Sequence, residues 1–131
     1  MGWDKYREVV FANQKQLGYF PHDAEMSAFD PDVEHWDDLS DDEKRLYTRM
    51  MEVYAGFHTY TDRHFGRLLD FLEQMGELDN TIIMMISDNG ASPEGGDVGS
   101  LNEYDFFNFL GEDLDNNLAD LDKLGSPESY N

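Results

Sequence analysis

Thr81-Ile82-Ile83-Met84-Met85-Ile86-Ser87 is the stretch that decides the fold of this chain, and Asp88-Asn89-Gly90 ends it. The run has the length of a β-strand, and its apolar residues do not alternate with polar ones. That pattern is typical of a strand buried on both faces in a parallel sheet between layers of helices. We therefore predict an α/β fold in which residues 81–87 form a buried core strand.

A single strand cannot complete a sheet, because its backbone N–H and C=O groups would be buried without partners. The 131 residues contain one confident run of this kind and no internal repeat. The sequence therefore predicts a partial domain: a piece of a larger α/β/α sandwich that is mostly helical here and has one core strand. No complete domain is expected within residues 1–131.

A long helix is predicted from about Asp41 to Met75. Ser40-Asp41-Asp42-Glu43 is a capping box, in which serine and glutamate each bond the other's backbone amide, and Gly76 is a natural stop. A helix of this length spans about 50 Å, more than a small domain can cover. Its apolar side recurs every three or four residues and is expected to be buried: Leu46, Met50, Val53, Phe57, Thr61, His64, Leu68, Leu72 and Met75.

The remaining segments are shorter. Trp3 to Leu17 has the apolar spacing of an amphipathic helix, with Gly18 as its stop. Residues 19–39 are predicted to be a loop interrupted by two prolines. The chain after Gly90 has the composition of a loop, and a short acidic helix is expected at residues 112–124.

Composition excludes several classes of function. The chain has 29 acidic and 9 basic residues, for a formal net charge of -20. Nucleic acid would be repelled, and a basic membrane-surface module is excluded. There is no cysteine, so there is no disulfide or thiolate metal site. No run approaches the roughly 20 apolar residues of a membrane span, and the compartment stays open.

Asp88 and Asn89 are the candidate metal ligands. They follow the predicted strand, and ligands bind at the carboxyl edge of open α/β sheets. A carboxylate and a side-chain carbonyl are hard oxygen ligands suited to calcium or magnesium. Asp-Asn-Gly is also a common turn, so spacing alone leaves both interpretations open. Calcium takes six to eight oxygen ligands, and a site here would need others from elsewhere.

Two further metal patterns are weaker. Asp113 begins a stretch like an EF-hand loop, but Leu118 replaces the turn glycine and Leu124 stands where the bidentate glutamate belongs. His58 and Asp62 share a helix face, but the two-histidine zinc motif is missing. The aromatic residues after the strand are expected to form a small hydrophobic cluster, or to line a cleft: Tyr104, Phe106, Phe107 and Phe109.

Taken in order, six stretches resemble arylsulfatases, the type I sulfatases of the alkaline phosphatase-like superfamily. Each stretch is weak alone, but the ordered set is specific and runs over nearly the whole chain. The stretches are Gly2-Trp3-Asp4 to Gly18, Trp36 to Tyr47, Met51-Glu52-Val53-Tyr54-Ala55, Thr61-Asp62 with Gly66 to Asp70, Gly76 to Thr81, and Ile86 to Ser92 followed by Glu94-Gly95-Gly96.

The resemblance implies an alkaline phosphatase-like α/β/α sandwich and the hydrolysis of sulfate esters. In this family the nucleophile is a formylglycine made from the first residue of a Cys/Ser-x-Pro-x-Arg motif, and a calcium ion binds the sulfate. The family's aspartate and asparagine ligands match Asp88 and Asn89. The resemblance thus assigns the calcium-ligand role to these two residues only.

The chain departs from the family in lacking the nucleophile motif. The family's other metal ligands, its catalytic histidines and its sulfate-binding lysines are also not found. We therefore expect this segment to need the remainder of the sulfatase domain and to be inactive by itself. Two alternatives stay open: a phosphoester hydrolase fragment of the same superfamily, and a non-catalytic acidic interaction module.

Overall fold

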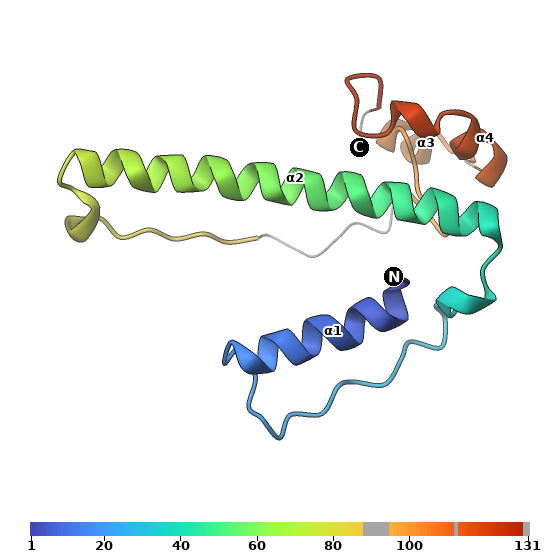
Figure 1. Ribbon diagram of the computed structural model, residues 1–131. Coiled ribbons are helices and arrows are strands. Elements are labelled where there is room, and N and C mark those ends of the chain that lie inside the picture. Colours follow the sequence, from blue (N-terminus) through green and yellow to red (C-terminus); the bar gives the residue numbers. More distant parts are fainter. Residues whose placement is uncertain (88–94, 112, 130–131) are drawn as a thin grey trace. The chain divides into compact units, whose positions relative to one another are not determined.

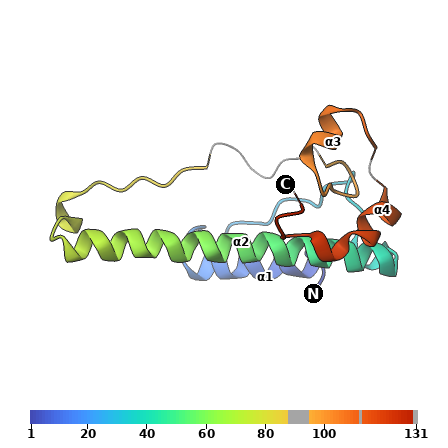
Figure 2. The ribbon, with the colours of Figure 1, turned by 90° about the horizontal axis from the view of Figure 1, so that it is seen from above.

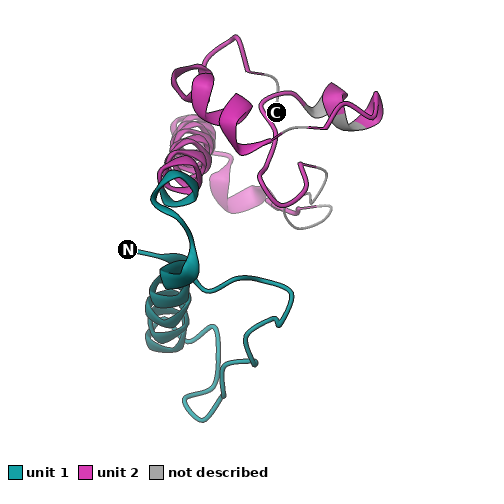
Figure 3. Cartoon of the chain, turned by 90° about the vertical axis from the view of Figure 1, so that its right-hand side faces the viewer, with its two compact units in different colours: residues 1–44 teal, residues 45–131 magenta. Residues whose placement is uncertain are grey.

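A computed structural model describes residues 1–87, 95–111 and 113–129, and these are helical or irregular (Figure 1). Two compact units are present, residues 1–44 and 45–131 (Figure 3). No helix in the described ranges has the length and apolar character needed to cross a bilayer. The elements in chain order are α1 (Trp3–Gln16), η1 (Trp36–Asp38), α2 (Asp41–Gln74), η2 (Leu78–Asn80), α3 (Glu103–Phe107), α4 (Leu114–Ala119) and η3 (Leu121–Lys123), where η marks a short 3₁₀ helix.

The first unit is built on α1, whose N-terminal end is held by η1. The indole Nε1 of Trp3 donates to the carbonyl of Glu34 at 3.0 Å, and the rings of Trp3 and Trp36 meet edge to face at 5.0 Å. A Cβ atom on Gly2 would lie 2.0 Å from Trp36, so only glycine fits before this helix. The helix ends before Gly18 at φ 79°, which confirms the predicted helix and its stop.

The start and end of α2 are also as predicted. The backbone amide of Glu43 donates to Ser40 Oγ at 3.2 Å, and the amide of Ser40 donates to Glu43 Oε2 at 2.7 Å. This reciprocal pair is the capping box. The helix ends at Gln74, and Gly76 follows with φ 72°. Local sequence therefore sets both ends of this 34-residue helix.

Only the first turns of the apolar stripe on α2 are covered within residues 45–131. Leu46 is fully buried, and the stripe continues through Met50 and Val53. A Cβ atom on Gly99 would lie 2.6 Å from Met50 Cε, and one on Gly125 would lie 2.9 Å from Val53 Cγ1. Two glycine turns therefore pack on this part of α2. The prediction of burial fails further along, where the exposed stripe residues are Phe57, Leu68 and Met75.

The predicted core strand is not formed. Residues 81–87 are extended but are drawn as a plain tube rather than an arrow (Figures 1 and 2). Ile82 is 87% exposed, Met84 83% and Ile86 90%, so the prediction of burial is wrong for this chain. The reason is the lack of neighbouring strands, which the sequence already indicates. A strand needs neighbours, and the described residues contain no other strand to pair with it.

The C-terminal part contains more helix than predicted. The acidic helix expected at residues 112–124 is present as α4 and η3, and Asp113 caps α4 by accepting the backbone amide of Asn116 at 2.8 Å. Helix α3 was not predicted, although Asn102 Oδ1 accepts the amide of Tyr104 at 3.1 Å as a local cap. Of the aromatic residues expected to form a cluster or line a cleft, three are exposed: Tyr104, Phe107 and Phe109.

Candidate functional site

Asp88 and Asn89, the predicted calcium ligands, lie outside the described residues. The described chain stops at Ser87 before them and resumes at Gly95 after them. Within the described residues, no three His, Asp or Glu side chains come close enough together to hold a metal ion. The described residues that flank the candidate site are those up to Ser87 and those from Gly95 onward.

A tight turn follows the candidate site at residues 96–99, and we call it the clamped turn. The amide of Gly99 donates to the carbonyl of Gly96 at 3.4 Å. Both glycines have positive φ, 63° and 73°, which side-chain-bearing residues rarely adopt. Just before the turn, a Cβ atom on Gly95 would lie 2.8 Å from the backbone N of Ser100. The backbone is therefore folded closely on itself at this point.

The side chain of Asn117 on α4 holds the clamped turn from one side. Its Nδ2 donates to the carbonyls of Val98 and Gly99, each at 3.2 Å, and the residue is only 1% exposed. Both N–H donors of the carboxamide are therefore directed at two successive carbonyls of the turn. A buried amide that lost these partners would be costly, so the contact is specific.

Helix α2 holds the same turn from the other side. The hydroxyl of Tyr47 donates to the carbonyl of Asp97 at 3.1 Å, and Met50 packs on Gly99. Between these two residues, Arg49 donates through Nη2 to the carbonyl of Leu124 at 3.0 Å, which ties the segment after α4 to α2. The turn beyond the candidate site is thus fixed to two helices.

The alternative pair His58 and Asp62 is not joined. No hydrogen bond links the two within the described structure, and the imidazole of His58 instead meets the ring of Tyr54 edge to face at 4.3 Å. Both side chains are exposed. His64, expected to be a core histidine, is half-buried, and its Nδ1 pairs with Nη1 of Arg67 at 2.9 Å. Neither histidine belongs to a metal-binding cluster among the residues that the structure describes.

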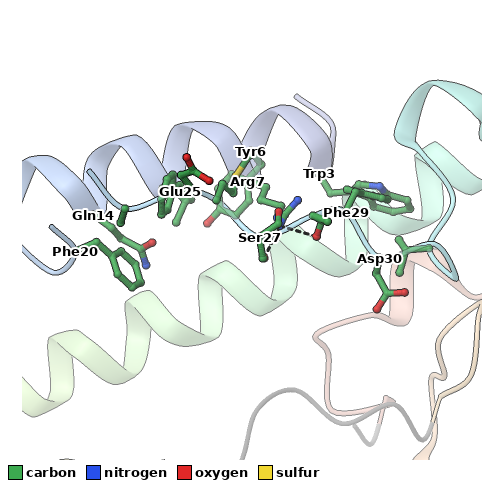
Figure 4. Close-up of a pocket in the computed structure, with 15 residues that line it drawn as sticks. Trp3, Tyr6, Arg7, Gln14, Phe20, Glu25, Ser27, Phe29 and Asp30 are labelled. Atoms are coloured by element: carbon green, nitrogen blue, oxygen red, sulfur yellow. Dashed lines mark hydrogen bonds between the residues drawn. The ribbon is translucent and has the colours of Figure 1, made fainter. Parts of the chain in front are cut away.

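A groove of about 880 Å³ lies in the first unit between α1 and the loop after it (Figure 4). Its described lining is mainly aromatic and aliphatic, and Arg7 is the only cation in it. Arg7 Nη2 already donates to Ser27 Oγ at 2.8 Å and to the carbonyl of Ala28 at 3.2 Å. This arginine therefore fastens the loop, and the groove offers an apolar recess rather than a set of reactive groups.

Comparison with known proteins gives the family. The model of the sulfatase family matches residues 17–120, which is more than half of the chain. The chain belongs to the sulfatase family. This family implies an alkaline phosphatase-like fold and is generally metal-dependent, and the match runs through Asp88 and Asn89.

Curated sulfatases match the chain over different lengths. An uncharacterized sulfatase of Schizosaccharomyces pombe is 40% identical over 91 residues, 69% of this chain and 16% of that protein. An arylsulfatase of Klebsiella aerogenes is 29% identical over 125 residues, 95% of this chain and 25% of that protein. An N-acetylglucosamine-6-O-sulfatase of Bacteroides thetaiotaomicron is 48% identical over 44 residues, 34% of this chain and 8% of that protein. The chain thus spans a quarter or less of these relatives, and no solved structure matches it significantly.

Proposed function

We propose that residues 1–131 are an internal segment of the catalytic domain of a sulfuric ester hydrolase of the arylsulfatase type. The observation that carries this proposal is the continuous family match over residues 17–120, which includes the stretch from Ser87 to Ser92. The printed names of two relatives, an arylsulfatase and an N-acetylglucosamine-6-O-sulfatase, favour sulfate over phosphate esters. The small share of each relative that the chain covers supports a partial domain.

Within this domain, Asp88 and Asn89 supply two oxygen ligands to a calcium ion. Their donor chemistry fits the ion, because calcium prefers carboxylate and carbonyl oxygens. Two residues are too few for its six to eight ligands, so the others come from the remainder of the domain. When bound, the cation offsets negative charge on the sulfate oxygens of the substrate. This chain's own contribution is to hold two ligands at the end of residues 81–87.

The isolated chain is inactive in this proposal. It has no cysteine and no Ser-x-Pro-x-Arg motif, so no residue in it matches the family's nucleophile. Residues 82–86 of its extended segment are exposed, and the described residues form no strand, so the edge that carries the ligands needs neighbouring strands from the rest of the domain. The partner that this segment needs is therefore the rest of the sulfatase domain.

The test is Asp88→Ala in the intact enzyme that contains this segment. Loss of a charged ligand weakens calcium binding, and we expect hydrolysis of 4-nitrophenyl sulfate to fall more than about 100-fold, since metal activation contributes several kcal/mol. Calcium binding, measured by calorimetry after chelation, should fall with it. Asp79→Ala is the matched control, because Asp79 is an exposed carboxylate at the opposite end of residues 81–87.

Two results contradict the proposal. Full activity and calcium binding in Asp88→Ala would remove the assigned role of this residue. Hydrolysis of 4-nitrophenyl sulfate by the purified 131-residue chain would remove the need for the remaining domain. If the chain instead folds alone and binds a macromolecular partner, the non-catalytic interaction module becomes the better explanation.

A further inference from the structure

The groove in the first unit has the size and lining of a small-molecule site. Its volume of about 880 Å³ falls within the roughly 300–1,000 Å³ of such sites, and its walls are mainly aromatic and aliphatic. All of its lining comes from residues 3–33, so it is formed within one compact unit. On α1 the lining runs from Trp3 to Gln14, a rise of about 16 Å along the helix axis. The groove is therefore suited to an elongated apolar ligand.

The cations beside this groove are already engaged by the chain itself. Arg7 donates to the loop after α1, as described above, and Lys15 donates to the carbonyl of His22 at 3.0 Å. The Nζ atom of Lys15 also lies 4.8 Å from the centroid of the Phe11 ring. Both cations thus hold the loop against α1 through neutral partners, and neither is paired with a carboxylate of the groove.

Two carboxylates line the groove, those of Glu25 and Asp30. Asp30 Oδ1 accepts the backbone amide of Asp32 at 3.0 Å, whereas Glu25 is exposed and has no side-chain partner within the described structure. Residues 1–44 contain 12 acidic and 4 basic residues, so the formal charge of this unit is -8. Apolar walls beside a free carboxylate complement a ligand with an apolar body and a positive charge.

We propose that this groove binds a hydrophobic organic cation of the arylalkylamine class. The apolar body of the ligand lies between α1 and the loop, and its ammonium group lies beside the carboxylate of Glu25. Figure 4 shows Glu25 between Phe20 at one end of the lining and Trp3 at the other. This binding is distinct from the hydrolysis of sulfate esters, since the groove contains neither of the proposed calcium ligands.

Two probes with the same apolar body and opposite charges test the proposal: 4-phenylbutylamine and 4-phenylbutyrate. Calorimetry at low ionic strength measures the affinity of the 131-residue chain for each. We expect the amine to bind about 10-fold more tightly, the effect of one nearby charge in a partly exposed site. Equal affinities would reveal an apolar recess without charge selectivity and would overturn the proposal, as would tighter binding of the carboxylate.

Glu25→Gln removes the charge, keeps the volume and should remove most of the preference for the amine. The variant should fold, because Glu25 is an exposed loop residue. Asp23→Asn is the matched control, since Asp23 is an exposed carboxylate of the same loop that does not line the groove. It lowers the net charge equally and should retain the preference. Equal losses in the two variants would assign the preference to the overall charge and contradict a site in the groove.

Two lysine variants locate the ligand on α1. Val10 lines the groove, whereas Val9 is similarly half-buried but does not line it. Val10→Lys places a positive charge in the groove and should reverse the order of the two probes, while Val9→Lys should leave that order unchanged. Circular dichroism establishes that both variants are folded. An unchanged order in folded Val10→Lys would place the ligand elsewhere and refute the proposal.

The same titration on the intact enzyme that contains this segment distinguishes a small cation from another part of the protein. Retention of the preference for 4-phenylbutylamine supports the proposal. Binding by the isolated chain but not by the intact enzyme would show that the remaining domain covers the groove, and the proposal would fail. Neither result involves Asp88, so the proposed function is tested separately.

Discussion

The carboxylate of Asp4 is shared between the imidazole of His35 and the backbone amide of Trp36, each at 2.7 Å. The hydrogen bond from Trp36, followed by the one with His35, holds the pKa of Asp4 below its ordinary value of 3.8. The hydrogen bond with Asp4 raises the pKa of His35 above 6.5, against an opposing effect of desolvation, and the nearby Asp38 and Asp37 add to the rise. This contact joins α1 to η1 within the first unit.

The signs of the two shifts define a pH window. The stabilisation from His35 is fully present below about pH 6.5 and is lost as the pH rises through the higher pKa of the folded state. The stabilisation from Asp4 is present above about pH 3.8 and is lost as the pH falls through its lower folded pKa. Because the pair of Asp4 and His35 is exposed to solvent, we expect its contribution to the free energy of unfolding, and to the pH dependence of that energy, to be small.

Tryptophan fluorescence can report this titration, because Trp36 bonds to Asp4 and its ring meets that of Trp3. We expect a step in emission as the pH rises above about 6.5, because a histidine with a raised pKa loses its proton there. His35→Gln should remove the step. His22→Gln, which changes another exposed loop histidine, should retain it. A step that survives in His35→Gln would assign the titration to a different group.

At the same scale, sequence reasoning missed Asn117. The sequence predicts an acidic helix at residues 112–124 and an EF-hand pattern from Asp113 that fails at two positions, but it gives no local reason to single out this asparagine. Its contacts are with carbonyls 18 and 19 residues earlier. Partners so distant depend on how α4 packs, which periodicity and spacing do not encode. The proposed ligands Asp88 and Asn89 lie outside the described residues, so their prediction stays a prediction.

Helices and their caps were predictable because their signals are local. Ser40 and Glu43 are three residues apart, and the structure shows the reciprocal bonds that this spacing predicts. Gly18 and Gly76 end helices through their own positive φ. The strand was a different case, since its formation depends on neighbours in the sheet rather than on residues 81–87. Apolar composition predicts burial, but residues 82–86 are exposed, because the described residues provide no strand beside them.

The capping bond between Ser40 and Glu43 should stabilise α2. Ser40→Ala removes the hydroxyl that accepts the amide of Glu43, and we expect a loss of about 1 kcal/mol in the free energy of unfolding. Urea denaturation followed by circular dichroism measures it. Thr48→Ala is the control, because Thr48 is an exposed residue within α2 whose hydroxyl has no hydrogen bond in the described structure. Equal losses in the two variants would show that the capping bond adds no stability.

The whole molecule combines a large negative charge with a large exposed apolar surface. Its formal net charge is -20, while Phe57 and Leu68 on α2, Met75 just after it, and residues 82–86 are exposed. Charge of one sign opposes association, and exposed apolar area favours it. Residues 81–87 have the features of a pairing edge, with high β-propensity, no charge, no proline and no glycine. Added salt screens the repulsion between like charges but does not weaken the attraction between apolar surfaces. The salt concentration therefore decides whether the chain associates.

We therefore expect the isolated chain to stay monomeric at low salt and to associate in about 1 M sodium chloride, where charges are screened beyond roughly 3 Å. Sedimentation velocity measures the association, and infrared absorption reports new β-structure. Met84→Lys places a charge in the segment and should suppress both changes, as charged residues do on natural edge strands. Met75→Lys adds the same charge at an exposed position on the turn after α2 and should still allow β-pairing. Association of Met84→Lys with undiminished β-structure would show that residues 81–87 are not the edge at which copies of this chain meet.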